Sequence, residues 1–128
     1  MAADRIPYLH IYEDDDGESH QEYKYVELTT GSSSGNSIGR LSELFPASGL
    51  IFRSTPADYD FKQHNAPRRQ WIVCLDAGVT ITTSDGAVNT VGAGGLIKVE
   101  DINGKGHSSK SADGKPRSSI FIPIPDDA

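Results

Sequence analysis

The chain has 128 residues, 36% of them hydrophobic, and a formal net charge of −6. This length suits a single domain with one packed core. The acidic balance argues against a nucleic-acid partner, because phosphate binding needs clustered Lys and Arg. No apolar stretch reaches membrane-spanning length and the N-terminus has no apolar signal-peptide core, so we expect no membrane partner and a cytoplasmic location. The single cysteine, Cys74, lies among apolar neighbours and is predicted to be a buried, inert thiol.

The N-terminal part of the chain is predicted to form two strands followed by a loop. Leu9–Tyr12 and Glu22–Leu28 flank the turn signal Asp16–Gly17. Residues 29–39 are rich in Ser and Gly and predict a mobile linker. One short helical turn is predicted for Ser37–Phe45.

Strand signals are dense in the rest of the chain. We predict strands at Leu50–Ser54, Tyr59–His64, Gln70–Leu75, Val79–Thr83, Ala87–Val91, Leu96–Val99, His107–Ser111 and Ser118–Ile124. Asp85–Gly86 and Asp113–Gly114 predict hairpins, and Pro123 is expected to end strand pairing. Many short strands without crossover helices predict an all-β fold, an antiparallel jelly-roll sandwich or barrel.

Two polar segments border these strands. His64-Asn-Ala-Pro-Arg-Arg-Gln70 precedes the apolar run Trp71–Leu75, and Gly104-Lys-Gly-His107 follows Leu96–Val99. Strands hold side chains at fixed spacing and direction, so histidines at two strand ends can meet inside a barrel. We therefore expect His64, Gln70 and His107 to converge in one cavity.

The two segments resemble the cupin family of small jelly-roll barrels. The first family motif contains His-x-His followed by Glu; His64 fits its first position, Ala66 stands at the second histidine and Gln70 at the glutamate. The second motif runs from a glycine to a histidine, here Gly94 and His107. The resemblance implies a double-stranded β-helix, with N-terminal strands in residues 1–28, a Ser/Gly-rich loop in 29–44 and the barrel core in 45–124.

The resemblance also implies a divalent metal, Fe, Mn, Ni or Zn, held by imidazoles and a carboxylate. At the matching positions this chain offers His64, Gln70 and His107, with His10 or His20 as further imidazoles. Neutral Gln is a poor substitute for a carboxylate around a hard cation. The cofactor is therefore predicted to be either such a metal on this reduced ligand set or none.

The preferred interpretation is acid/base chemistry without a metal, because histidine can exchange protons near neutral pH. His64 and His107 would be catalytic, and Gln70 and Tyr59 would contact a small polar or anionic metabolite. The guanidinium groups of Arg68 and Arg69 match an anionic substrate.

Three functions remain open at this stage: a non-oxidative isomerase, cyclase or lyase, a metal-dependent dioxygenase-like enzyme, and a non-catalytic small-ligand binder. Glu100 and Asp101 are predicted to be surface turn residues, although a carboxylate near His107 would raise its basicity. Gly104 and Gly106 are expected to clear space for a ligand around His107. By the resemblance we also expect a homodimer that pairs through the N-terminal strands, with Trp71 in the core or the dimer interface.

Overall fold

A computed structural model describes residues 4–30 and 39–128, which fold into strands and connecting loops. The strands are β1 (Arg5–Glu13), β2 (Ser19–Glu27), β3 (Thr29–Thr30), β4 (Arg40–Leu41), β5 (Ile51–Thr55), β6 (Asp60–His64), β7 (Gln70–Cys74), β8 (Val79–Thr83), β9 (Val88–Val91), β10 (Leu96–Val99), β11 (His107–Ser111) and β12 (Arg117–Pro123). Each strand of the predicted barrel core begins and ends within one residue of its prediction.

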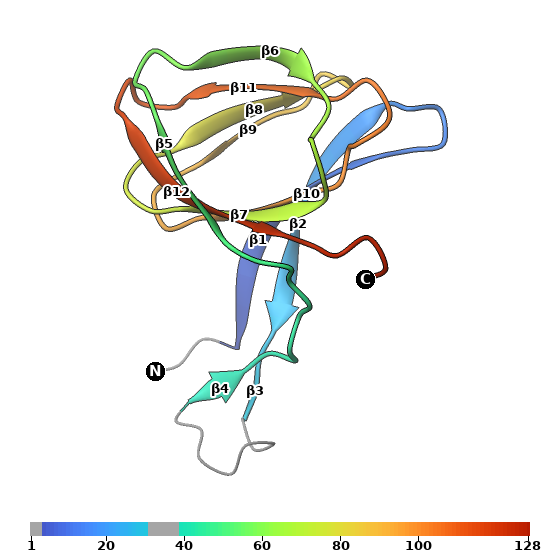
Figure 1. The fold of residues 1–128 in the computed structure, drawn as a ribbon, viewed down its shortest axis with the longest axis vertical. Coiled ribbons are helices and arrows are strands. Elements are labelled where there is room, and N and C mark those ends of the chain that lie inside the picture. The colour runs from blue at the N-terminus through green and yellow to red at the C-terminus, as the bar shows by residue number, and fades with distance from the viewer. Residues whose placement is uncertain (1–3, 31–38) are drawn as a thin grey trace.

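Ten of these strands form two facing sheets, and β3 and β4 pair as a separate two-stranded sheet (Figure 1). The larger sheet has the order β2-β1-β10-β7-β12-β5, and the smaller one has the order β6-β11-β8-β9. This arrangement confirms the predicted all-β jelly roll. Pairing is antiparallel except between β1 and β10, which run parallel.

The N-terminal strands belong to the barrel. β1 pairs with β2 along its whole length and with β10 on its other side, so both of its edges are occupied within one chain. Leu9 and Ile11 point inward, are fully buried and join the hydrophobic core. The outer end of this hairpin extends away from the barrel toward β3 and β4 (Figure 1).

The structure corrects three local predictions. Residues 39–45 form no helix: they contain β4 and then irregular chain, and Ser37 lies outside the described residues. Most of the predicted linker, residues 31–38, also lies outside them, while its first residues pair with β4. The Asp113–Gly114 turn is no hairpin, because it joins β11 in the smaller sheet to β12 in the larger one.

The core lies between the sheets and consists of side chains that alternate along each strand. On β8, for example, Val79 and Ile81 are buried while the intervening Thr80 is not. Cys74 is fully buried, as predicted, and burial raises the pKa of its thiol. No helix of the described residues is both long enough and apolar enough to span a lipid bilayer.

Candidate functional site

The cavity between the sheets has a volume of about 490 Å³. Its walls combine apolar side chains from both sheets with a few polar groups. Of the predicted site residues, five line it: His64, His107, Gln70, Tyr59 and Arg68. Arg69 does not; its guanidinium lies instead against Glu100, with Nε 2.8 Å from Oε2. The predicted substrate contact of Arg69 stays a prediction, and its side chain is not part of the cavity lining.

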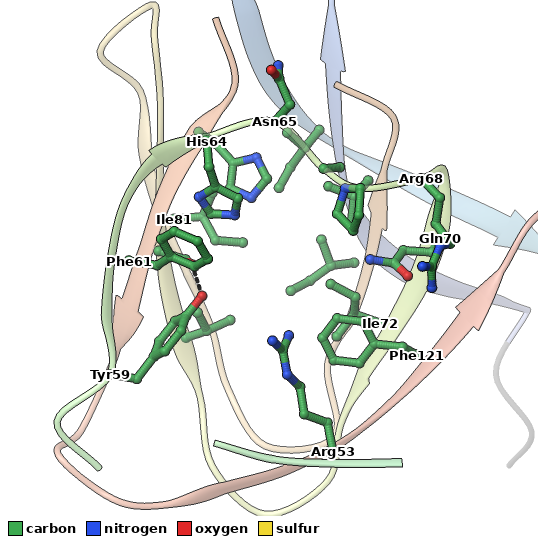
Figure 2. Close-up of a pocket in the computed structure, with 18 of the residues that line it drawn as sticks. Arg53, Tyr59, Phe61, His64, Asn65, Arg68, Gln70, Ile72, Ile81 and Phe121 are labelled. Carbon is green, nitrogen blue, oxygen red and sulfur yellow. Dashed lines mark hydrogen bonds between the residues drawn. The ribbon is translucent and has the colours of Figure 1, made fainter. Parts of the chain in front are cut away.

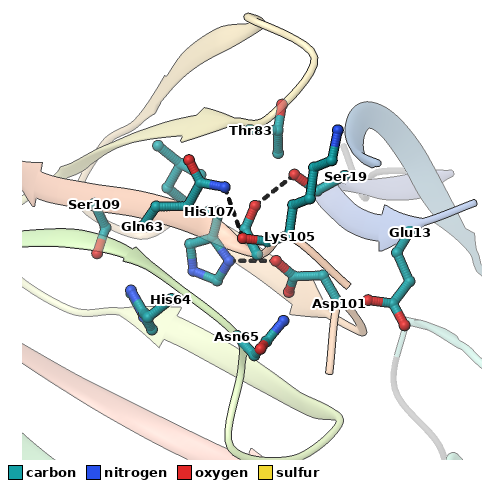
Figure 3. Close-up of polar contacts among 12 residues, drawn as sticks. Glu13, Ser19, Gln63, His64, Asn65, Thr83, Asp101, Lys105, His107 and Ser109 are labelled. Carbon is teal, nitrogen blue, oxygen red and sulfur yellow. Dashed lines mark hydrogen bonds and ion pairs between the residues drawn. The ribbon is translucent and has the colours of Figure 1, made fainter. Parts of the chain in front are cut away.

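His64 lies at one end of the cavity (Figure 2), and His107, which also lines the cavity, lies beside it (Figure 3). They are direct partners in the register of β6 and β11, and their ring centroids are 4.7 Å apart. The rings are tilted by 53° to each other, and His64 also stacks on Phe61 at 3.9 Å. The predicted convergence of these two histidines is thus present in the structure.

A buried carboxylate orients His107. Asp101 has no exposed surface, and its Oδ2 lies 2.5 Å from His107 Nδ1 (Figure 3). The carboxylate accepts this hydrogen bond, so Nδ1 carries the proton and Nε2 of the neutral ring is an open acceptor. Asp101 is not the surface turn residue that the sequence predicted. It is a buried partner of the histidine.

His64 has the same tautomer for a different reason. Its Nδ1 donates to the backbone carbonyl of Lys62 at 2.8 Å. Nε2 of the neutral ring is therefore free of a proton here too. Both imidazoles offer an unshared electron pair on Nε2, and both rings line the cavity.

Two glycines fix the loop before His107, and not in the predicted way. Gly106 has φ +76°, and a Cβ there would lie 2.1 Å from the carbonyl oxygen of His64. A Cβ on Gly104 would lie 2.3 Å from the carbonyl oxygen of Gly17. The glycines therefore allow close backbone contact rather than clearing space for a ligand. Ser19 adds a hydrogen bond of 2.6 Å to the Gly106 carbonyl (Figure 3).

Gln70 and Tyr59 differ in how their polar atoms are satisfied. Gln70 is 3% exposed, and its Oε1 has no hydrogen-bond partner among the described residues. A buried amide oxygen without a partner is costly, so it is available to a bound molecule. The Tyr59 hydroxyl is already paired with Ser109 Oγ at 2.9 Å (Figure 2).

The residues of the cavity do not fit a divalent metal. Among the described residues, no group of three or more His, Cys, Asp or Glu side chains could hold one ion. No Asp or Glu of the described chain lines the cavity, whereas Arg53, Arg68 and Arg117 do. His64, Gln70 and His107 would supply only neutral ligands, and guanidinium charges nearby oppose a cation.

The two other histidines that were considered as metal ligands lie outside the cavity lining. His10 Nε2 is 2.5 Å from Glu100 Oε1, on the outer face of the larger sheet where Trp71 also lies. Glu100 is thus a partly buried ion-pair partner rather than a free turn residue. His20 lies between the carboxylates of Asp14 and Asp85.

Three residues at the site are not among those predicted from the sequence: Asp101, which is predicted only as a turn residue near His107, and the two cavity-lining arginines Arg53 and Arg117. The predicted last strand begins at Ser118, one residue after Arg117. If its alternation is extended back by one residue, Arg117 lies on the same face as Ser119 and the apolar Phe121, which points to the cavity.

No protein-family model matches the sequence, and a comparison with curated proteins also finds no match. Among solved structures, the Schizosaccharomyces pombe Cnp3 cupin domain is similar to this chain, with a TM-score of 0.48 and 14% identity. The match covers 96% of this chain and 86% of that one. The all-β jelly-roll fold of this chain rests on its own two facing sheets.

Proposed function

We propose that this protein is an enzyme that moves a proton at a carbon atom of a small organic molecule, without a metal. Its class would be isomerase or lyase. The observation that carries the proposal is the buried His107–Asp101 pair beside His64, because it leaves two Nε2 atoms open at one end of the cavity. An imidazole fixed by a carboxylate in one tautomer is a common general base.

The proposed reaction begins when His107 Nε2 removes a proton from a carbon next to a carbonyl or carboxyl group. The C–H electron pair stays on the substrate as an enolate, and Asp101 stabilises the imidazolium that forms. The protonated form of His64 can return a proton to another carbon or to a leaving group.

Gln70 and the apolar walls support this chemistry. The unpartnered amide oxygen of Gln70 can accept a hydrogen bond from a donor group of the substrate and so fix its orientation. Apolar side chains such as Ile72 and Ile81 line the same cavity and limit access of water to the reacting carbon.

Proton exchange with solvent tests the proposal even while the substrate is unidentified. The protein is incubated in D2O with a panel of small oxo, hydroxy and unsaturated acids, and the loss of C–H signals is followed by proton NMR. We expect catalysed exchange in at least one compound, lost in His107→Ala and kept in His20→Gln, a histidine outside the cavity. Exchange in no compound, or exchange that survives in both His64→Ala and His107→Ala, would contradict the proposal.

A further inference from the structure

A buried arginine lies in the cavity without a counterion. Arg117 is 7% exposed, and its Nε has no hydrogen-bond partner among the described residues. No ion pair joins Arg53, Arg68 or Arg117 to a carboxylate in residues 4–30 and 39–128. A buried charge without a partner is costly to keep in a folded protein. Such a group indicates a partner that the chain itself does not supply.

Other unsatisfied groups lie next to Arg117. Thr55 is its direct partner in the β5–β12 register, and Ser119 shares its face of β12. Both hydroxyl oxygens are buried and lack a partner among the described residues. We call these three residues, together with Arg53, the arginine corner. Thr55 and Ser119 lie behind Arg117 and are not part of the cavity lining, so the described part of the chain gives the Arg117 guanidinium no carboxylate on the strand side, and its charge is left to a polar ligand group in the cavity.

Arg53 adds a second guanidinium to the arginine corner. It is the register partner of Ser119, and its guanidinium carbon lies 4.9 Å from the Phe121 ring centroid. Figure 2 shows Arg53 pointing into the cavity between Tyr59 and Phe121, across from His64. The guanidinium carbon of Arg117 lies 5.8 Å from the Tyr59 ring centroid. Aromatic faces stabilise these cations in part and leave their N–H edges free.

From this geometry we infer that the arginine corner binds the carboxylate of an organic acid whose apolar body fills the cavity toward His64 and His107. A planar guanidinium matches a carboxylate with two parallel hydrogen bonds. The guanidiniums of Arg117 and Arg53 suit an anionic group, and the apolar walls suit a hydrocarbon or aromatic body. This inference deepens the proposed function, because it names the class of substrate. Arg117 and Arg53, unlike Arg69, line the cavity and are the anion contacts that it names.

Binding of benzoate tests the inference independently of turnover. Titration calorimetry is carried out with benzoate, with its neutral analogue benzamide and with inorganic phosphate. We expect benzoate to bind, and Arg117→Met to weaken it about 10- to 100-fold, the range expected for a lost charged hydrogen bond. Lys115→Met, which removes an exposed positive charge elsewhere, should leave binding unchanged.

Two further readouts make the outcome decisive. Without benzoate, the melting temperature of Arg117→Met should equal or exceed that of the wild type, since an uncompensated buried charge is gone. If Arg117→Met does not fold, Arg53→Met, at an exposed position, should still weaken benzoate. Equal binding of benzoate and benzamide, tighter binding of phosphate, or benzoate affinity unchanged in the arginine variants would overturn the inference. Benzoate binding without proton exchange in any panel compound would contradict only the proposed function.

Discussion

The two ends of the cavity differ in how their polar groups are satisfied. At the histidine end, the chain itself supplies the partners: Asp101 for His107, and the Lys62 carbonyl for His64. At the arginine corner, Arg117, Thr55 and Ser119 keep unpaired buried atoms. The first arrangement fixes two rings and leaves their Nε2 atoms ready for a reaction. The second leaves a charge whose partner must come from outside. Asp101 Oδ1 also lacks a partner among the described residues, so the contrast concerns the two imidazole rings, which the chain orients, and the Arg117 charge, which it leaves uncompensated.

The largest expected effect is at the histidine end. His107→Ala removes the proposed general base and should lower the rate of proton exchange by about 10²–10⁴-fold, the usual contribution of such a group. Binding of benzoate at the arginine corner should change little. NMR exchange rates and calorimetry on the same preparation check both statements. If His107→Ala instead lost its affinity for benzoate and kept its exchange rate, the roles assigned to the two ends of the cavity would be reversed.

Asp101→Asn tests whether the buried carboxylate positions His107. Asparagine has nearly the shape of aspartate but lacks the charge that stabilises the imidazolium, so we expect exchange to slow by at least about 10-fold. The tautomer of His107 should also lose its preference for Nδ1–H, which a ¹⁵N NMR spectrum of the imidazole detects. A normal tautomer together with a normal exchange rate would show that Asp101 has no positioning role.

Gly106→Ala tests whether the loop before His107 needs its close contact with β6. The new Cβ would lie 2.1 Å from the carbonyl oxygen of His64, in a backbone conformation with positive φ. We expect a loss of about 2 kcal/mol or more in the free energy of unfolding. Gly114→Ala is the matched control, since Gly114 has φ +70° and a Cβ there would meet nothing within 4 Å. Equal losses in urea unfolding of the two variants would contradict a special role of the contact.

The smallest expected effects come from the two histidines outside the cavity. Burial lowers the pKa of His10 below its ordinary value of 6.5, with Lys24 and Lys98 adding to this effect and Glu100 opposing it. As the pH falls, His10 therefore takes up a proton in the unfolded chain at a higher pH than in the folded chain. The free energy of unfolding consequently falls as the pH drops through about 6.5. His10→Gln should reduce that fall, as measured by urea unfolding between pH 8 and pH 5.

His20 should behave in the opposite way. Its hydrogen bonds to Asp14 and Asp85 raise its pKa above 6.5. The protonated His20 ring therefore stabilises the fold. This stabilisation is fully present below the pKa that His20 has in the unfolded chain, and it is lost as the pH rises through the pKa that it has in the folded chain. His20→Gln should therefore cost more stability at pH 5 than at pH 8. The same pH dependence in both variants would contradict the assigned pKa directions.

Strand positions and the meeting of His64 with His107 could be predicted from the sequence, because alternation and turn residues are local signals. The partners of these histidines could not. Asp101 follows a strand and precedes a Gly-rich turn, a position that looks solvent-exposed until the loop is seen packed against Gly17 and His64. Arg69 and Arg68 are neighbours in sequence, yet only Arg68 lines the cavity, and no sequence pattern distinguishes the two.

Two imidazoles share the cavity, each with Nδ1 protonated and Nε2 open to a ligand. A long-range ¹H–¹⁵N NMR spectrum at alkaline pH, assigned with His64→Gln and His107→Gln, measures this tautomer directly. We expect the Nδ1–H form for both rings, and a shift of the His107 Nε2 signal when benzoate is added. An Nε2–H form of His107, or cavity histidines that do not respond to benzoate, would contradict this arrangement.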